Sequence, residues 1–309
     1  MKPLLIALAG VGKIARDQHL PTIAASDRFA LAGVVSRHAD DLGVPAAATL
    51  TELKRQVPDL AAVSICTPPI GRLALIREAL DLGLDVMVEK PPAATLSEAE
   101  QFEGLARAAG RALYLTWHSR EADGVEPLRR WLEGRTIHSV AIEWMEDVRV
   151  WHPGQEWIWE PGIGVFDPGI NALSILTRLL PTPVTVEAAT LRYPADRAAP
   201  IAASLAMASA AAAAITAEFS FDQRGPQTWA MTVRTDAGEA VLRDGGGTLA
   251  IDGAPVPTES ATEYGRLYGR FADLVARRAI DADLAPFRLV ADSFLLGRRE
   301  TVAPFRWTD

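Results

Sequence analysis

The chain contains a single cysteine, Cys66, among its 309 residues. One cysteine cannot form an internal disulfide, and it supplies no thiolate cluster for a metal ion. No long block of like charge is present, and the formal net charge of -8 argues against a nucleic-acid surface, where a basic patch is expected. We therefore expect a cytoplasmic protein that does not bind nucleic acid.

Apolar runs long enough to span a membrane are also missing. The N-terminal run Pro3–Ala9 resembles the start of a secretory signal, but it stops at Gly10 and Lys13. The uncharged stretch 202–217 consists mostly of small residues and is shorter than the roughly 20 apolar residues that a bilayer requires. We interpret it as two short strands and a turn, and we expect no membrane association.

The length is that of about two domains, and 49% hydrophobic and 23% charged residues suffice for two ordinary cores. In the first part, apolar runs of strand length alternate with helical stretches such as 14–25 and 73–82. This alternation predicts α/β architecture with a doubly wound parallel sheet, a Rossmann domain, over residues 1–117. The predicted strands are Pro3–Ala9, Phe29–Val35, Leu60–Cys66, Val86–Val88 and Ala112–Thr116.

A glycine-rich turn follows the first predicted strand directly. Gly10 permits a tight turn, Gly12 lets a pyrophosphate approach the backbone at the start of a helix, and Ala15 lets that helix pack on the strand. The turn therefore predicts a dinucleotide site, with Lys13 and Ile14 at the helix start among its contacts. An ordinary strand-to-helix turn is the alternative interpretation of so short a motif.

The sequence pattern changes after residue 117. Runs in which apolar and polar residues alternate, and runs rich in β-forming residues, are joined there by turns. Such runs predict a second α/β domain, residues 118–309, with an open and mainly antiparallel sheet. We expect helices 164–180 and 262–279 to cover one face of that sheet, and the last helix, 287–298, to pack back on the first domain. The predicted strands are 139–145, 184–191, 214–221, 229–234 and 239–242.

Several segments together resemble a known family over essentially the whole chain. They are the glycine-rich turn continued as 11–21, Glu89-Lys90-Pro91, 116–120 and 151–155. The chain resembles the family of glucose-fructose oxidoreductase and inositol 2-dehydrogenase, in which a Rossmann domain precedes an α/β domain with an open sheet. Within the family, segments 11–21, 116–120 and 151–155 are most similar to bacterial 1-dehydrogenases of L-arabinose and D-galactose.

The resemblance implies catalytic roles for Lys90, Asp167 and Asn171. An amine at the end of a strand, beside a nicotinamide, can hydrogen-bond the hydroxyl being oxidised and help to remove its proton; a solvated lysine before two prolines is the alternative. Asp167 and Asn171 fit the family pattern D-x-G-x-H, with asparagine in place of histidine. An amide cannot shuttle a proton, so Asn171 can only orient a hydroxyl. Since Asp-Pro also suits a helix N-cap and its first position, a capping role for Asp167 stays open.

Aromatic and polar residues are dense between these two groups, as expected where a sugar binds. By resemblance we expect Glu146 and His152 at the sugar hydroxyls, His118 near C1 or the ring, and Trp151 among the substrate contacts. For Trp144, on an alternating strand, a core position is favoured, and His152 is equally consistent with a structural role. We expect no metal ion, because His118 and His152 have no third ligand at a recognised spacing.

The cofactor is predicted from the end of the second strand, where NAD-specific folds place an acidic residue. Here Ser36, Arg37 and His38 follow, and these side chains can bind a 2′-phosphate, so we favour NADP while NAD stays possible. The resemblance adds cofactor contacts from Thr67, Pro68, Glu89 and Lys90. Pro69 stands where the family usually carries asparagine, which removes any contact from that side chain.

These expectations predict an NAD(P)-dependent aldose 1-dehydrogenase that passes hydride from C1 of L-arabinose or D-galactose to the cofactor and forms a lactone. The two sugars share their arrangement at C2, C3 and C4, so we expect limited selectivity between them. The alternatives are oxidation at another ring carbon, as in inositol dehydrogenases, and a non-catalytic sugar or NADP sensor. By analogy with the family, we expect a homo-oligomer formed through the open sheet face.

Overall fold

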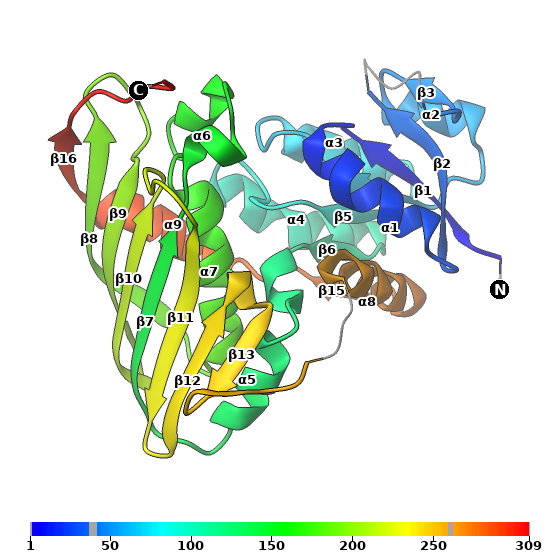
Figure 1. The fold of residues 1–309 in the computed structure, drawn as a ribbon. Coiled ribbons are helices and arrows are strands. Elements are labelled where there is room, and N and C mark those ends of the chain that lie inside the picture. The colour runs from blue at the N-terminus through cyan, green and yellow to red at the C-terminus, as the bar shows by residue number, and fades with distance from the viewer. Residues whose placement is uncertain (1, 37–41, 259–261, 309) are drawn as a thin grey trace. The chain divides into compact units, whose positions relative to one another are not determined.

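The computed structural model describes residues 2–36, 42–258 and 262–308, and the chain forms two compact units (Figure 1). Unit 1 comprises Met1–His118 and Thr262–Leu284, and unit 2 comprises Ser119–Ala261 and Ala285–Asp309. The predicted division near residue 117 is therefore one of three crossings between the units. The chain returns to unit 1 at residue 262 and leaves it again after residue 284.

Unit 1 contains a seven-stranded sheet whose neighbours all run parallel, in the order β15-β6-β5-β4-β1-β2-β3. This is the order of a doubly wound dinucleotide-binding sheet, extended by the edge strand β15, and it confirms the predicted Rossmann domain. The strands are β1 (Leu4–Ala9), β2 (Phe29–Val35), β3 (Ala46–Ala47), β4 (Ala62–Ile65), β5 (Asp85–Val88), β6 (Leu113–Leu115) and β15 (Ile280–Asp281).

The central strands β4 and β5 are buried along their whole length, as expected of parallel strands covered on both faces. Thr49 and Thr95 are the N-caps of α2 and α4, and their hydroxyl oxygens accept hydrogen bonds from the backbone amides of Glu52 and Glu98. The helical segments of this unit are η1 (Ala15–His19), α1 (Leu20–Ala24), α2 (Leu50–Gln56), α3 (Arg72–Asp81), α4 (Leu96–Ala109) and α8 (Glu263–Arg277).

Unit 2 contains a nine-stranded sheet in the order β14-β13-β12-β11-β7-β10-β9-β8-β16. Most neighbours are antiparallel, whereas β10 with β7 and β16 with β8 are parallel, so the expected open, mainly antiparallel sheet is confirmed. The strands are β7 (Ile137–Met145), β8 (Val184–Pro194), β9 (Ala202–Ser209), β10 (Ala212–Ser220), β11 (Thr228–Thr235), β12 (Gly238–Arg243), β13 (Thr248–Ile251), β14 (Ala254–Pro255) and β16 (Arg298–Val302).

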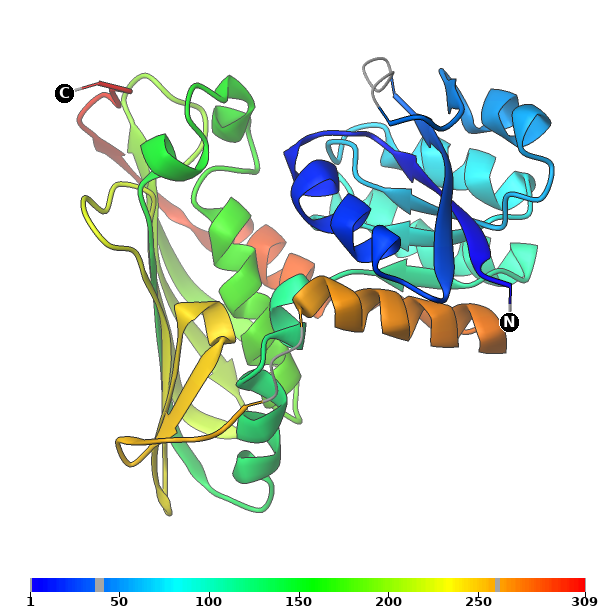
Figure 2. The ribbon, with the colours of Figure 1, turned by 45° about the vertical axis from the view of Figure 1, so that its right-hand side comes forward.

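Helices cover one face of the unit 2 sheet (Figure 2). Helix α7 packs between α5 and α9 and against β7, while α9 packs on β8. The alanine-rich stretch forms β9 and β10, as the sequence predicted. The helical segments are η2 (His118–Glu121), α5 (Val125–Leu132), α6 (Val148–Trp151), η3 (Glu156–Trp159), α7 (Phe166–Leu179), η4 (Asp244–Gly246) and α9 (Ala285–Leu296).

The last two long helices exchange the places that the sequence predicted for them. Helix α8, expected on the second sheet, puts Tyr264, Leu267, Tyr268 and Phe271 into the core of unit 1 (Figure 2). Helix α9, expected to pack on the first domain, packs inside unit 2 on β8 and α7. An amphipathic pattern predicts that a helix has an apolar face, but it does not say which sheet that face covers.

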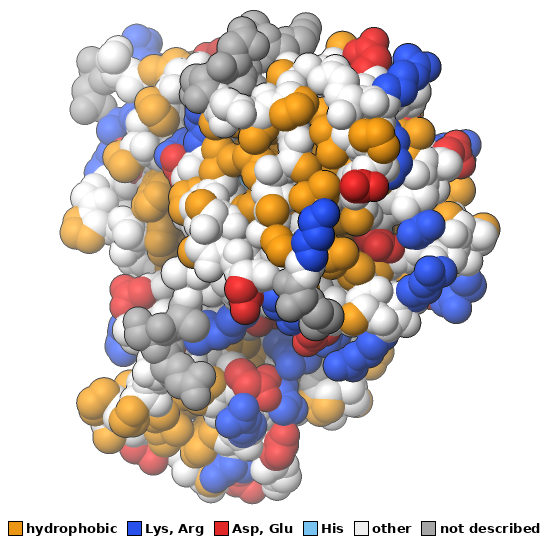
Figure 3. Space-filling model, turned by 90° about the vertical axis from the view of Figure 1, so that its right-hand side faces the viewer, with side chains coloured by type: hydrophobic (Ala, Val, Ile, Leu, Met, Phe, Trp, Pro, Cys, Tyr) orange, Lys and Arg blue, Asp and Glu red, His pale blue; other side chains and the backbone are white. Residues whose placement is uncertain are grey.

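The described part of the chain contains no helix that is both long and apolar enough to cross a membrane. On the face drawn in Figure 3, the described acidic and basic side chains are interspersed, with hydrophobic side chains between them. No extended basic surface is visible on that face among the described residues, in keeping with the net charge.

Candidate active site

The glycine turn of unit 1 has the backbone that a dinucleotide site requires. Gly10 has φ +88°, and a Cβ there would lie 2.8 Å from the amide nitrogen of Thr67, so only glycine fits without strain. Gly12 is exposed, and a Cβ on it would meet nothing within 4 Å. The backbone next to Gly12 therefore faces open space at a helix start, which fits a pyrophosphate.

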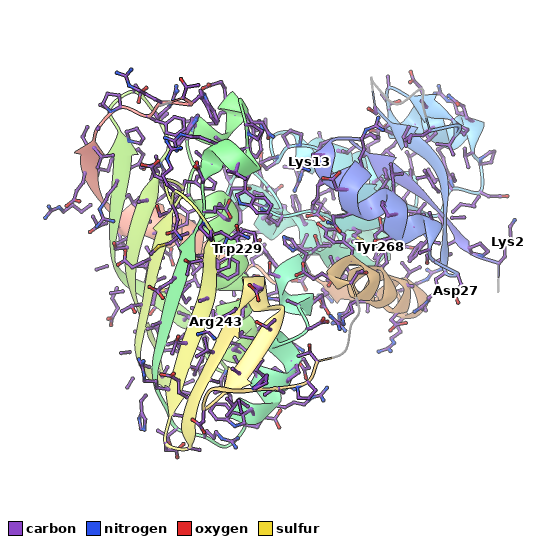
Figure 4. All side chains as sticks on the ribbon, in the orientation of Figure 1. Lys2, Lys13, Asp27, Trp229, Arg243 and Tyr268 are labelled. Carbon is purple, nitrogen blue, oxygen red and sulfur yellow. The ribbon has the colours of Figure 1, made fainter. Side chains whose placement is uncertain are left out.

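The other predicted cofactor residues of unit 1 lie near strand ends. Lys13 and Ile14 are exposed after the turn, and the Lys13 ammonium pairs with Asp17 one helical turn later (Figure 4). Ser36 follows β2 and donates its amide to the Ala47 carbonyl at 3.2 Å. The two remaining candidates of this strand end, Arg37 and His38, lie outside the described residues.

Lys90 is half-buried in the loop after β5, next to a cis Lys90-Pro91 peptide. The loop is held by the buried guanidinium of Arg72, which donates to the carbonyl oxygens of Glu89 and Pro91. The same guanidinium donates through Nε to the Thr67 carbonyl at 3.0 Å. Arg72 thus ties the Lys90 loop to the loop after β4, where Thr67 and the exposed Pro68 were predicted to border the cofactor.

Glu89, for which the resemblance implies a cofactor contact, has a buried side chain that is bonded to protein groups. Glu89 is 3% exposed, and its Oε1 accepts from His19 Nε2 at 3.0 Å and from the Tyr264 hydroxyl at 2.9 Å. Its Oε2 accepts the Lys90 amide at 3.1 Å. Both oxygens therefore face protein donors in the interior of unit 1, where an apolar surround makes unpaired charge costly.

Charge and burial shift the pKa values of Glu89 and His19 in opposite directions. Burial favours the neutral acid, but the hydrogen bond and positive charge of His19, with smaller contributions from His118 and Tyr264, lower the pKa of Glu89 to about 2. Burial likewise opposes the imidazolium, yet the neighbouring Cys66 side chain and, after it, the hydrogen bond to Glu89 raise the pKa of His19 well above its ordinary value. Tyr268 lies on the other side of the ring, with its hydroxyl 2.8 Å from His19 Nδ1 (Figure 4).

His118, predicted near C1 or the ring of the sugar, is the last residue of the first segment of unit 1. Its Nδ1 lies 2.7 Å from Glu263 Oε2, and its ring stacks on Tyr264 with centroids 5.8 Å apart. Glu263 and Tyr264 form the first turn of α8. The helix that the sequence assigned to the second domain therefore holds both His118 and, through Glu89, the Lys90 backbone.

In unit 2, Asp167 and Asn171 lie one turn apart on α7, as their spacing predicted. The N-cap of α7 is Val165, so Asp167 lies inside the first turn and the capping alternative is wrong. The Asp167 carboxylate pairs with His152, whose Nε2 lies 3.3 Å from Asp167 Oδ2. The structure thus brings together two predicted site residues from α7 and from the loop after α6.

A tryptophan cluster, defined as Trp144, Trp151 and Trp229, lies beside the predicted sugar residue Glu146. Glu146 is 4% exposed and its Oε2 accepts from Trp229 Nε1 at 2.9 Å. The Trp229 ring on β11 packs between Trp144, 6.1 Å away, and Trp151, 5.1 Å away (Figure 4). Trp144 is buried, as favoured from the sequence, whereas Trp151 is 40% exposed.

The C-terminal residues fix the segment that carries Trp151 and His152. The Arg149 guanidinium lies over the Phe305 ring at 4.4 Å, and its Nε donates to the carbonyl of Arg306 at 2.8 Å. Phe305 also packs on Trp159, with ring centroids 4.6 Å apart. Trp307 Nε1 donates to Glu156 Oε1 at 2.7 Å. Residues 305–307 therefore bind the α6–η3 segment at both ends.

Sequence reasoning assigned no role to three residues of these sites: His19, Tyr264 and Trp229. His19 stands inside the segment 11–21 that carried the resemblance, and a histidine in a helix behind a phosphate turn is a usable signal. Trp229 was visible only as one residue of an alternating strand. Tyr264 gave no signal, because nothing local says that α8 belongs to unit 1.

Within residues 2–36, 42–258 and 262–308, no group of three or more His, Cys, Asp or Glu side chains could hold a metal ion. Of the two histidines considered as ligands, His118 pairs with Glu263 and His152 with Asp167.

Comparison with known proteins identifies the first unit. The sequence model described as "Oxidoreductase family, NAD-binding Rossmann fold" matches residues 4–116. Among curated relatives, galactose 1-dehydrogenase of Pseudomonas fluorescens is 44% identical over 305 residues, which cover 99% of each chain. An uncharacterised oxidoreductase of Escherichia coli strain K12 is 32% identical over 124 residues, covering 38% of this chain and 35% of that protein.

Solved structures show the same likeness over both units. The crystal structure of a D-galactose-1-dehydrogenase protein from Rhizobium etli matches with a TM-score of 0.94, at 46% identity and 99% coverage of both chains. A 3-ketoreductase from Actinomadura kijaniata, solved with TDP-benzene and NADP, matches with a TM-score of 0.81 at 17% identity, over 97% of this chain and 99% of that one. The second likeness shows the fold alone.

Proposed function

The chain belongs to the oxidoreductase family with an NAD-binding Rossmann fold, and we propose that it oxidises C1 of an aldopyranose, D-galactose or L-arabinose, to the lactone. The observation that carries this proposal is the 44% identity to a galactose 1-dehydrogenase over 99% of the chain. The likeness covers 99% of the chain and so extends through unit 2, in which Glu146, His152 and Asp167 are the groups proposed to recognise the sugar.

Unit 2 supplies the side chains that would bind the sugar. Trp151 and Trp229 offer ring faces for the C–H patches of a pyranose, and Glu146 is a fixed acceptor beside them. Asp167 and His152 form a carboxylate–imidazole pair that can accept from and donate to hydroxyls. The Asn171 amide orients a hydroxyl without transferring its proton.

Unit 1 would supply the cofactor site and the amine. A bound nicotinamide would supply the acceptor for the hydride from C1. Lys90 hydrogen-bonds the C1 hydroxyl and helps to remove its proton. Its loop is suited to this role, because Arg72 and Glu89 fix the backbone on both sides of the residue.

We propose NADP as the preferred cofactor, with NAD as a second substrate. Ser36, Arg37 and His38 are the side chains proposed for the 2′-phosphate, and no acidic residue stands among them to repel it. Gly10, Gly12, Lys13 and Ile14 would hold the pyrophosphate, and Thr67 and Pro68 would border the nicotinamide ribose.

A substrate panel tests the function. D-galactose, L-arabinose, D-glucose, D-xylose and myo-inositol are each assayed with NADP and with NAD, following the reduced nicotinamide, and NMR identifies the product. We expect turnover of D-galactose and L-arabinose and a lactone product. Turnover of myo-inositol alone would favour oxidation at another ring carbon, and no turnover of any sugar, with cofactor still bound, would favour a sensor.

A lysine variant tests the mechanism. Lys90→Met is expected to lower kcat by about 10²-fold or more, because a general base contributes roughly 10²–10⁴-fold, while the Kd for NADP stays within about two-fold. Lys2→Met, an exposed lysine before β1, is the matched control and keeps wild-type kcat. Near-normal turnover of Lys90→Met would contradict the assignment.

We also infer a homo-oligomer formed through the uncovered face of the nine-stranded sheet. The exposed side chains on this face of β9 and β10 are short or polar, among them Ala206, Thr216 and Glu218, and a second copy can approach such a face closely. Sedimentation of wild type and Ala206→Arg measures the association. A smaller species is expected for the variant, and an unchanged monomeric mass for both proteins would contradict the inference.

A further inference from the structure

The buried network around His19 connects three elements of unit 1 that are distant in sequence. His19 lies at the end of η1, directly after the nucleotide turn; Glu89 follows β5; Tyr264 and Tyr268 lie on α8. The side chain of His19 is 0% exposed and that of Glu89 is 4% exposed. Burying these polar side chains costs free energy, because each must be desolvated. We therefore expect the network to have a role that compensates for this cost.

The hydrogen bonds of His19 and Tyr264 connect to the Lys90 backbone through the Glu89 carboxylate. The two donors on Glu89 Oε1, from His19 and Tyr264, fix the carboxylate in its plane. Its other oxygen then accepts the Lys90 amide at 3.1 Å. Burial and the Glu89 charge raise the pKa of Tyr264 well above its ordinary value, so the phenol stays protonated and donates.

The first turn of α8 also fixes His118. Glu263 Oε2 lies 2.7 Å from His118 Nδ1, while the neighbouring Tyr264 ring stacks on the imidazole and meets the His19 ring edge-on at 5.0 Å. Two consecutive residues of one helix therefore set the position of both residues of unit 1 that are proposed to act on the substrate.

We propose that His19 and Tyr264 are positioning residues for Lys90, acting through the Glu89 carboxylate, and that α8 is thereby a working part of the catalytic unit. This inference rests on the proposed function of Lys90. It predicts that the Tyr264 hydroxyl, which is buried and donates to Glu89, matters for turnover.

The test uses variants that change single donors. Tyr264→Phe removes one hydroxyl and keeps the stacked ring, His19→Leu removes both ring donors, and His19→Gln restores one donor toward Glu89. Tyr193→Phe, a buried tyrosine on β8 of unit 2, is the matched control. We measure kcat and KM for D-galactose and the Kd for NADP.

We expect Tyr264→Phe to lower kcat by about 10-fold, because a small misplacement of a reacting group is costly, with KM and Kd within about two-fold. His19→Leu should lower kcat further, His19→Gln should recover part of it, and Tyr193→Phe should match wild type. If His19→Leu does not fold, Tyr264→Phe still decides the matter.

A second readout does not depend on catalysis. The chain has only four lysines, Lys2, Lys13, Lys54 and Lys90, so ¹⁵N-lysine labelling gives at most four backbone amide signals. Lys90→Arg identifies the Lys90 signal by its loss. We expect that signal to move in Tyr264→Phe and to stay in Tyr193→Phe.

The two readouts separate the two proposals. Should wild type oxidise no aldose while the Lys90 amide signal moves in Tyr264→Phe, the proposed function fails and the positioning network stands. Unchanged kcat in an active enzyme, or an unchanged Lys90 amide signal in Tyr264→Phe, would overturn the positioning inference.

Discussion

The buried pair His19–Glu89 makes a quantitative prediction about stability. Their side chains are 0% and 4% exposed and 3.0 Å apart, and the pKa of Glu89 falls from its ordinary 4.5 to about 2. Each unit of difference between folded and unfolded pKa is worth about 1.4 kcal/mol. The folded surroundings of Glu89, in which His19 is the main favourable partner, therefore stabilise its ionised form by about 3 kcal/mol net of burial.

The pH dependence of the stability of unit 1 follows from the directions in which the two pKa values are shifted. The stabilisation from Glu89 is fully present above pH 4.5 and is lost as the pH falls from 4.5 toward 2. The His19 contribution is fully present below 6.5 and is lost as the pH rises through the higher pKa of the folded state. The coupling should therefore be greatest between pH 4.5 and 6.5 and should shrink on the acidic side.

A double-mutant cycle with His19→Leu, Glu89→Leu and the double variant measures this coupling. Hydrogen exchange of β1 and β5 peptides reports the opening free energy of unit 1 alone, which a global melt of two units would not. Each single variant should lose about 3 kcal/mol or more, and the double variant much less than the sum, because it leaves no unpaired charge in the core.

An exposed ion pair serves as the control cycle. Arg234 and Glu239 in unit 2 are 2.9 Å apart but 59% and 43% exposed, so their coupling should lie within about 0–1 kcal/mol. A His19–Glu89 coupling no larger than that of the control, or one that does not change with pH, would refute the reasoning from burial.

Three further predictions concern the two proposed binding regions. Trp229→Phe removes the donor from the buried carboxylate of Glu146 and should raise KM for the aldose about 10-fold, from an unpaired-group cost of roughly 1–3 kcal/mol, with cofactor Kd unchanged; an unchanged KM would contradict a role in sugar binding. Gly10→Ala puts a Cβ 2.8 Å from the Thr67 amide at positive φ and should weaken NADP binding at least about 10-fold, from roughly 1–3 kcal/mol of strain, as titration would show; wild-type affinity would mean that the turn does not form the site. Phe305→Ala should destabilise unit 2 by about 3 kcal/mol and raise KM for the aldose without changing cofactor Kd; hydrogen exchange of the α6–η3 peptides checks this, and wild-type protection there would show that the C-terminal residues do not hold the segment.

The sequence by itself determined the features that depend on local pattern. Apolar runs and glycine positions predicted the parallel sheet, because a strand buried on both faces and a turn at positive φ each need particular residue types. Spacing predicted Asp167 and Asn171 on one helix, since four residues make about one turn.

Only the tertiary structure decided the features that depend on partners distant in the chain. The pairing of His152 with Asp167 and the packing of Trp229 on Glu146 join elements separated by loops, and no spacing rule fixes such contacts. Above all, α8 carries an apolar face that would suit either sheet, and its entry into unit 1 is what buries Tyr264 against Glu89. The apolar face of a helix shows from its sequence that this face will be buried. Which surface it packs against depends on the free energies of all the alternative packings of the whole chain.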